Sequence, residues 1–418
     1  MLFHDYFSDN FDIIFKLFKQ KNHATYESKY HTNYLSLKGF EQNLKSHKTN
    51  LISAIKSKTF RFSSLYPVVI YDKKKPEKKP RLICIPTIQD RLVQMILIKY
   101  LAEHHKDDLA MFKSSDFSVE GVGIIQARQK AKDLRSTKEF VLKTDISSFF
   151  DNLDRSQLIK DFRQTLPLDI FYLFESIVKC DPLIPLDYSK NRKQLIQSKS
   201  GKGVRQGMPL SPLIASFYLS EFDEWLKRKK YKHVRYADDL IFFLDSKEQC
   251  ESVFLEVEQQ LKNIQLSLPR IDEESKTQII APYQPVTFLG LDLSYENEQY
   301  NWYIPSHIIA NVEDSLIELT SISKNIQKKL TFSKTINRME QIVLGYAHCY
   351  KDAESKNLKD FRNRLCDTQS KAINMLFKNL GIDISKVQTD HKSYLIGTSK
   401  SPLLGFVAQR FEMQSAPN

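Results

Sequence analysis

The chain has 418 residues and a net charge of +12, and 41% of its residues are hydrophobic. This length and composition predict two or three domains with real cores, or one large multi-lobed body. The positive charge favours a polyanionic partner such as nucleic acid, although a lysine-rich coding bias would also produce it. The five cysteines are scattered without a CxxC pair, which argues against zinc sites and disulfide frameworks.

We expect a cytoplasmic protein without a membrane partner. No apolar run reaches the about 18 residues that a membrane span needs. The N-terminal residues lack the basic and apolar regions of a signal peptide.

The N-terminal part of the chain predicts helices and then a basic hairpin. Residues 1–60 are expected to be helical, with an apolar stripe that packs on the body (Phe11, Ile14, Phe15 and Phe18). Residues 66–71 and 81–86 predict two strands around a lysine-rich turn, and an apolar helix follows from Asp90. Solvation alone explains some of these lysines. Arg81 differs because it begins a strand, from which a guanidinium can make bidentate contacts with a triphosphate.

The next segment predicts a strand that ends in an acidic residue. Residues 120–123 predict a tight turn before a helix near Ile124, and their lone GxG matches no dinucleotide or P-loop fingerprint. An apolar strand then ends in Asp145, and a helix is expected over residues 155–164. A carboxylate in this position suits a metal site, with a helix cap or plain turn as the alternative.

Residues 165–200 predict helices and a loop with little functional signal, and a glycine-rich stretch follows. Gly201, Gly203 and Gly207 permit a loop that approaches a ligand closely. Ser211 and the proline after it predict the start of a long apolar helix, whose N-terminus would attract anions. A plain junction between loop and helix is the alternative.

Residues 234–244 predict a β-hairpin with Asp238 and Asp239 at its tight turn. Two neighbouring buried anions need a compensating cation, and a hard divalent ion such as Mg²⁺ is suited to carboxylate oxygens. The alternative is an Asp-Asp turn exposed to water.

The rest of the chain predicts structural elements. Residues 250–264 show a core-facing helical stripe, and strands are expected near residues 278–280 and over 286–293. Residues 305–380 predict helices, and the tail beyond them carries no clear pattern.

Asp145, Asp238 and Asp239 suit two metal ions about 3.5–4 Å apart, which activate a 3′-hydroxyl and stabilise a departing pyrophosphate. Four stretches carry a family resemblance: IPTIQDR at 85–91, KTDISSFF at 143–150, RQGMPLSP at 205–212 and YADD at 236–239. Together they resemble the reverse transcriptases, most closely the bacterial lineage of group II intron, retron and abortive-infection enzymes. The similarity runs from about residue 50 to 295 and weakens through residues 344–350.

The resemblance implies an α+β, right-hand polymerase fold with fingers, a palm built on an antiparallel sheet, and a helical thumb. The implied boundaries are 1–60 for an N-terminal helical extension, 61–140 for the fingers, 141–300 for the palm with a fingers insertion at about 155–200, 301–380 for the thumb, and 381–418 for a C-terminal tail.

The resemblance also implies roles for individual residues. Two Mg²⁺ ions, with Mn²⁺ as a substitute, would be held by Asp145, Asp238, Asp239 and the backbone of Ile146. Lys276 would act as a general acid near the pyrophosphate, with a solvated surface lysine as the alternative. The implied nucleotide-binding residues are Arg81, Lys79, Gln206, Gly207 and Phe150, whose ring would exclude a ribose 2′-hydroxyl. The implied primer grip is Phe288, Leu289 and Gly290.

The implied function is RNA-directed DNA polymerase, with an RNA template, deoxynucleotides and a DNA product as partners. No His- and Cys-rich HNH pattern follows the thumb in this sequence, which favours a stand-alone defence-associated enzyme that copies a cognate non-coding RNA. One alternative is a template-independent or protein-primed DNA polymerase of the abortive-infection type. Another is a group II intron-like maturase acting as an RNA-binding protein, although such a scaffold has no need of three clustered acids.

Overall fold

The computed structural model divides the chain into two compact units. The first comprises Met1–Ala127 and Phe140–Ile279, and the second comprises Arg128–Glu139 and Ile280–Asn418. The described residues are 1–22, 35–71, 79–106, 109, 116–118, 123–272 and 275–383. Most of the predicted glycine turn at 120–123, most of the lysine-rich turn and nearly all of the C-terminal tail lie outside them.

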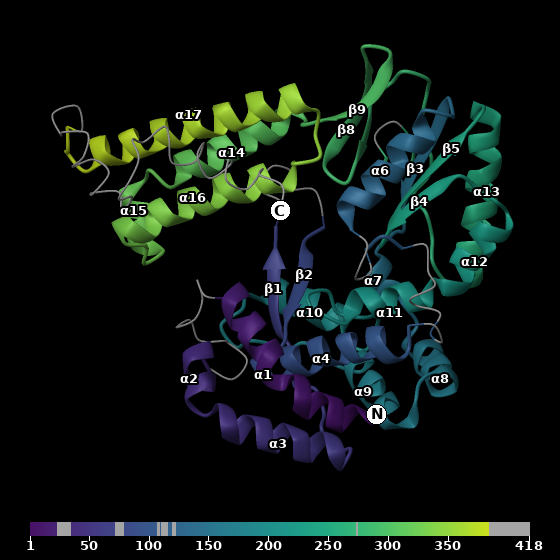
Figure 1. Cartoon of the computed structure of the whole chain (residues 1–418), viewed down its shortest axis with the longest axis vertical. Helices are drawn as coiled ribbons and strands as arrows, with labels where there is room; N and C mark the ends of the chain where they lie inside the picture. Colours follow the sequence, from purple (N-terminus) through teal and green to yellow (C-terminus); the bar gives the residue numbers. More distant parts are fainter. Residues whose placement is uncertain are drawn as a thin grey trace. The chain divides into compact units, whose positions relative to one another are not determined.

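The N-terminal helices of the first unit pack on a central apolar helix. Helix α1 (Phe3–Lys21) buries the predicted aromatic stripe, and it packs against α3 (Leu44–Lys56) and α4 (Ile88–His104). Figure 1 shows these helices together with the short α2 (Leu37–Gln42). The prediction of a helix packed on the body is confirmed, because α1 belongs to the same unit as the strands that follow it.

Strands β1 (Tyr66–Ile70) and β2 (Arg81–Ile85) form the predicted antiparallel hairpin, with Ile70 opposite Arg81. The hairpin places Arg81 beside the lysine-rich turn, at the first position of the return strand. The side chain of Arg81 is exposed there, as a ligand-binding role would require.

A four-stranded sheet in the order β4-β5-β3-β6 lies in the first unit's core. Its strands are β3 (Phe140–Asp145), β4 (His233–Tyr236), β5 (Asp239–Leu244) and β6 (Gln278–Ile280). Every residue of β5 after Asp239 is buried, which is the pattern of a central strand covered on both faces. Helix α13 (Lys247–Asn263) packs on β3 and β5 and buries the predicted apolar stripe.

Among its described residues, the first unit also contains six further helices: α7 (Phe149–Asn152), α8 (Arg155–Thr165), α9 (Leu168–Val178), α10 (Lys190–Lys199), α11 (Ser211–Tyr218) and α12 (Ser220–Arg228). The prediction of one long helix from Ser211 was wrong, because the helix breaks at Leu219, whose ψ is 5°. The break is compatible with core packing, because Leu219 is buried and so are Phe222 and Leu226 in α12.

The second unit combines α6 (Ile124–Arg135), most of which belongs to it, with a three-stranded antiparallel sheet and a helical bundle. Residues 286–293 were predicted as one strand, but they contain β7 (Val286–Phe288), a turn at Leu289 and Gly290, and the start of β8 (Leu291–Glu296). Strand β9 (Gln299–Tyr303) completes the sheet. The predicted C-terminal helices are α14 (Ser306–Glu318), α15 (Ile322–Gln327), α16 (Phe332–Cys349) and α17 (Ser355–Asn379).

Helices α14, α16 and α17 pack against one another, and Figure 1 shows them lying side by side. Antiparallel sheets and helical segments together make an α+β fold, as predicted. In the part of the chain that the structure describes, no helix has both the length and the apolarity to cross a membrane.

Candidate active site

The acid-bearing turn lies at one end of the four-stranded sheet. Strands β4 and β5 form a hairpin in which Asp239 pairs with Tyr236 and Asp238 lies in the turn. The pairing of β3 with β5 places Asp145 directly opposite Asp239. The backbone N–H of Ile146 donates a hydrogen bond of 3.0 Å to the carbonyl oxygen of Asp238. Two segments far apart in the sequence therefore bring three aspartates to one sheet end.

These carboxyl groups are poorly hydrated. Asp145 is only 5% exposed, and its Oδ1 atom has no hydrogen-bond partner among the described residues. Burial raises the pKa of Asp239 to about 6, and the negative charge of Asp238 contributes to the increase. Burial also raises the pKa of Asp238, with the charge of Asp145 adding to it and the charges of Lys276 and Arg81 opposing it. Desolvated neighbouring anions of this kind favour a bound cation.

The donor set fits a hard divalent ion, because carboxylate oxygens are the ligands that Mg²⁺ prefers. The orphaned Oδ1 atom of Asp145 supplies an unused ligand atom. Within the described ranges, however, no group of three or more His, Cys, Asp or Glu side chains is arranged to hold an ion. The other carboxylate oxygen of Asp145 instead contacts the ammonium group of Lys276. A metal ion would have to replace this contact, and the Lys276 side chain is 67% exposed and has room to move.

Thr277, the residue after Lys276, anchors this segment beside the sheet. The hydroxyl groups of Thr277 and Thr144 lie 2.7 Å apart, and Thr277 also donates to the carbonyl oxygen of Pro269 at 2.8 Å. Thr277 is fully buried. These contacts hold the start of β6 against β3 and keep the Lys276 ammonium within reach of Asp145.

A buried ion network supports the acid-bearing turn, and we did not predict it from the sequence. Arg235 is fully buried on β4 and donates to both carboxylate oxygens of Asp223, at 2.7 and 2.5 Å. It also donates to Asp116 at 2.9 Å and to the carbonyl oxygen of Ala237 at 3.0 Å. Asp116 in turn accepts from the backbone N–H of Ala237 at 2.9 Å. Ala237 has a φ of +54°, and the network stabilises this unfavourable conformation next to Asp238.

The glycine-rich loop joins Phe150 to strand β2. The N–H of Val204 donates to the carbonyl oxygen of Phe150 at 2.7 Å, and the N–H of Cys84 donates to that of Gln206 at 2.7 Å. A Cβ atom at Gly207 would lie 2.6 Å from the Cys84 carbonyl oxygen, so only glycine fits this approach.

A cavity of about 490 Å³ opens along this loop, lined by Phe150, Gln206, Gly207, Met208, Pro209, Ser211 and Pro212. The structure thus brings together three of the residues predicted to bind the nucleotide. Phe149 is buried in the core, whereas Phe150 is half-buried and faces the cavity. Arg81 is linked to the acids through its charge, which acts on Asp238, and Lys79 is exposed two positions before it.

Comparison with known proteins identifies the family. Residues 72–293, more than half of the chain, match the family model described as reverse transcriptase (RNA-dependent DNA polymerase). The chain belongs to the reverse transcriptase family. The matched range contains the acid-bearing strands, the glycine-rich loop and β2. Membership of this family implies the right-hand polymerase fold.

Two relatives illustrate the similarity of this chain to other proteins. It is 26% identical over 247 residues to the group II intron-encoded protein LtrA of Lactococcus lactis subsp. cremoris, covering 56% of this chain and 36% of the relative. It is 22% identical over 291 residues to the retrovirus-related Pol polyprotein from type-1 retrotransposable element R2 of Nasonia vitripennis, covering 60% of this chain and 27% of the relative. The matches therefore span about a third of the first relative's length and about a quarter of the second's.

A second ion network anchors the glycine-rich loop. Its centre, Asp181, lies in residues 165–200, where we predicted no functional residue. The Asp181 carboxylate accepts from Arg155 at 2.6 Å, from buried Arg205 at 2.9 Å and from the N–H of Gly201 at 2.9 Å. These contacts lower the pKa of Asp181 although burial opposes them. The loop that holds Phe150 is thus fixed at its base.

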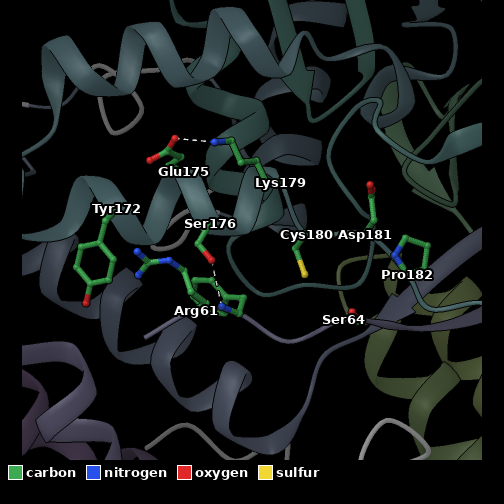
Figure 2. Close-up of a pocket in the computed structure, with 10 residues that line it drawn as sticks. Arg61, Ser64, Tyr172, Glu175, Ser176, Lys179, Cys180, Asp181 and Pro182 are labelled. Carbon is green, nitrogen blue, oxygen red and sulfur yellow. Dashed lines mark hydrogen bonds and ion pairs between the residues drawn. The ribbon is translucent and has the colours of Figure 1, made fainter. Parts of the chain in front are cut away.

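A second cavity of the first unit, about 620 Å³, is lined by Asp181 but by none of the three aspartates of the acid-bearing turn (Figure 2). Figure 2 shows the ion pair of Glu175 with Lys179 among the residues that line the cavity. It also shows the Ser176 hydroxyl group, which accepts a hydrogen bond from the backbone N–H of Phe62. Burial raises the pKa of the Cys180 thiol to about 12, which disfavours its thiolate form. Because this cavity contains none of the predicted site residues, we do not assign the active site to it.

The predicted primer-grip residues lie in the second unit. Leu289 and Gly290 form the β7–β8 turn, both with positive φ, and buried Phe288 ends β7. Buried Arg128 donates to the carbonyl oxygen of Leu289 and to Asp352, the latter at 2.6 Å. Arg128 and Asp352 were not predicted, and they fix the shape of this turn.

Proposed function

We propose that the chain is an RNA-directed DNA polymerase that forms cDNA by two-metal nucleotidyl transfer. The supporting observation is the placement of Asp145 opposite Asp239, beside Asp238, with an unpartnered buried oxygen on Asp145. Asp145, Asp238, Asp239 and the backbone carbonyl of Ile146 would hold two Mg²⁺ ions, or Mn²⁺ in their place. When bound, these ions supply activation of the primer 3′-hydroxyl and charge stabilisation at the leaving pyrophosphate.

We propose that Lys276 changes partner during the reaction. In the structure its ammonium neutralises Asp145. When a cation replaces it there, the exposed side chain is released toward the pyrophosphate, where it would donate a proton as a general acid. Arg81, with Lys79 beside it, would bind the incoming triphosphate, because a guanidinium makes bidentate contacts with phosphate oxygens.

Phe150 would select the sugar of the incoming nucleotide. Its ring lines the cavity with Gln206 and Gly207, and its backbone is fixed by the glycine-rich loop. A 2′-hydroxyl would clash with that ring, so Phe150→Val is expected to raise ribonucleotide incorporation at least tenfold relative to deoxynucleotides. Single-nucleotide extension with each sugar measures this ratio, and an unchanged ratio would remove Phe150 from the role.

The domain assignment follows from the same proposal. Residues 61–140 would form the fingers, 141–300 the palm with its insertion at about 155–200, and 301–380 the thumb, after an N-terminal extension of residues 1–60. Phe288, Leu289 and Gly290 would hold the primer end. The partners would be an RNA template, deoxynucleotides and the DNA product.

The central experiment measures deoxynucleotide incorporation on an RNA template with purified protein and Mg²⁺. Asp238→Ala is expected to lose at least a thousandfold of activity, because it removes a ligand of the reacting centre. Asp245→Ala is the matched control: this aspartate is exposed after the other end of β5 and should leave incorporation unchanged. Equal activity of Asp238→Ala and the parent protein would overturn the site assignment.

The same assay tests the other readings. A template-independent or protein-primed polymerase would incorporate deoxynucleotides without RNA, and its product would remain attached to the protein or have homopolymer sequence. A maturase would bind RNA equally well with Asp238→Ala and show no incorporation. For the biological role we propose antiphage defence on a cognate non-coding RNA, by resemblance to that lineage. Sequencing of co-purified RNA and phage plating with the Asp238→Ala strain test it.

A further inference from the structure

A row of three tyrosine rings lies at the three-stranded sheet of the second unit, and none of the three is among the predicted site residues. Tyr295 on β8 pairs with Tyr300 on β9, and their ring centroids are 5.0 Å apart. The ring of Tyr283 lies 4.9 Å from that of Tyr295. Tyr300 is buried, but Tyr295 is 38% exposed and Tyr283 is 68% exposed. The row therefore runs from the core to the surface.

Cationic side chains from α6 and the residues just after it surround these rings. The Arg135 guanidinium lies 5.1 Å from the centroid of the Tyr300 ring and donates to the carbonyl oxygen of Ala281 at 2.9 Å. Lys132 donates to Asn301 at 2.7 Å. Together with the tyrosines, Lys132, Arg135, Lys138 and two carboxylates, Glu139 and Glu298, line a cavity of about 520 Å³.

Hairpin stability explains only part of this arrangement. Cross-strand aromatic pairs stabilise antiparallel sheets, which accounts for Tyr295 and Tyr300. It does not account for Tyr283, which follows β6 and exposes most of its ring to water at the mouth of the cavity. An exposed aromatic face beside lysines is the composition that binds unpaired nucleic acid, because any base can stack on the ring while ammonium groups meet the phosphates.

We propose that this pocket, formed by Tyr283, Tyr295, Tyr300, Lys132 and Lys138, binds an unpaired nucleotide of RNA. The exposed ring of Tyr283 would stack on the base, and the two lysines would attract the flanking phosphates. Arg135 holds the buried end of the tyrosine row in place. The proposal rests on the proposed function only in taking RNA as the partner, and it uses none of the residues assigned to catalysis.

The test measures binding of fluorescein-labelled oligouridylate by fluorescence anisotropy with the full chain at fixed salt. The double variant Tyr283→Ala/Tyr295→Ala is expected to bind at least tenfold more weakly, since one stacked base contributes about 1–3 kcal/mol. Tyr283→Phe keeps the ring and should bind like the parent protein. Tyr303→Ala is the matched control, because Tyr303 lies on β9 at odd spacing from Tyr300 and so on the opposite face. It should change the affinity less than twofold.

Unchanged affinity of the double variant, or an equal loss with Tyr303→Ala, would overturn the proposal. Photocrosslinking of 4-thiouridine RNA provides a second readout that does not depend on a folded variant. The crosslinked peptides should include residues 283 or 295, and crosslinks found only elsewhere would also overturn it. Failure here is distinguishable from failure of the proposed function, because Asp238→Ala should keep oligouridylate binding and lose incorporation.

Discussion

At the scale of single residues, the acid-bearing turn shows what a buried charge requires. Asp239 is the first residue of β5 and follows Asp238 directly. Burial and the negative charge of Asp238 raise the pKa of Asp239 to about 6. An aspartate with an elevated pKa destabilises the folded protein once it ionises. The turn is therefore shaped for a bound cation and is less stable without one.

The linkage predicts a pH-dependent effect of Asp239→Asn in metal-free protein. The pKa of Asp239 rises from its usual 3.8 to about 6 on folding, so its ionisation costs stability progressively between these values and fully above the higher one. Asparagine cannot ionise, and the variant should therefore be more stable than the parent at pH 7.5 by about 1–3 kcal/mol. Near pH 4 this difference should vanish.

Thermal melts in EDTA at both pH values measure this difference. Exposed Asp245→Asn is the control and should show no such pH dependence. A gain of equal size at pH 4 and pH 7.5 would contradict the charge-based explanation. Mg²⁺ should reduce the difference, because it stabilises the parent by binding to the folded state.

At the scale of elements, close backbone contacts hold the glycine-rich loop, and they leave no room for a side chain at Gly203 or Gly207. A Cβ atom at Gly203 would lie 2.3 Å from the carbonyl oxygen of Phe150, where the neighbour is backbone and cannot rotate away. Gly201 has a similar positive φ, but a Cβ atom there would meet nothing within 4 Å. Alanine substitutions at these two positions therefore distinguish the effect of backbone strain, which both would have, from that of a steric clash, which only Gly203 would have.

We predict that Gly203→Ala lowers deoxynucleotide incorporation at least tenfold, because it pushes the loop away from Phe150. Gly201→Ala carries only the strain of a left-handed residue, about 1 kcal/mol, and should keep near-normal activity. Steady-state kinetics should show the Gly203 effect mainly as a higher KM for the nucleotide. Similar kinetics for both variants would show that the close approach to Phe150 does not matter.

The sequence predicted the elements that have local signals. Two apolar runs rich in β-branched and aromatic residues predicted β4 and β5, and a separate apolar run ending in Asp145 predicted β3. The break at Leu219 was missed because no glycine or proline stands there and all nearby apolar residues are compatible with one helix. The turn at Gly290 was missed although its glycine was visible, because flanking apolar residues resemble a single strand.

The supporting ion networks could not be predicted because their members are far apart in the sequence. Arg235 meets Asp116 across 119 positions, and Arg128 meets Asp352 across 224. No periodicity links such residues, and their charges suggest an exposed location. Sequence patterns therefore indicate the residues that face a ligand more readily than those that hold them in place.

At the scale of the whole molecule, the chain path ties the two units together in sequence. The second unit takes Arg128–Glu139 from the middle of the first unit's sequence and everything from Ile280 onward. That inserted segment is structurally essential to its sheet. Arg128 holds the β7–β8 turn, Lys132 bonds to Asn301, and Arg135 covers the ring of Tyr300.

We therefore predict that a fragment of residues 280–418 does not fold alone, because removal of α6 uncovers Tyr300 and leaves the half-buried carboxylate of Asp352 without the guanidinium group of buried Arg128. Loss of one member of a buried ion pair alone costs about 3–5 kcal/mol, a large part of the stability of a small domain. A fusion that supplies residues 124–139 through a flexible Gly/Ser linker should restore a cooperative thermal transition in circular dichroism. The same fusion with Arg128→Ala and Arg135→Ala is the control and should remain unfolded. Cooperative melting of the 280–418 fragment at the same Tm as the fusion would contradict this prediction. It would show that α6 does not stabilise the second unit.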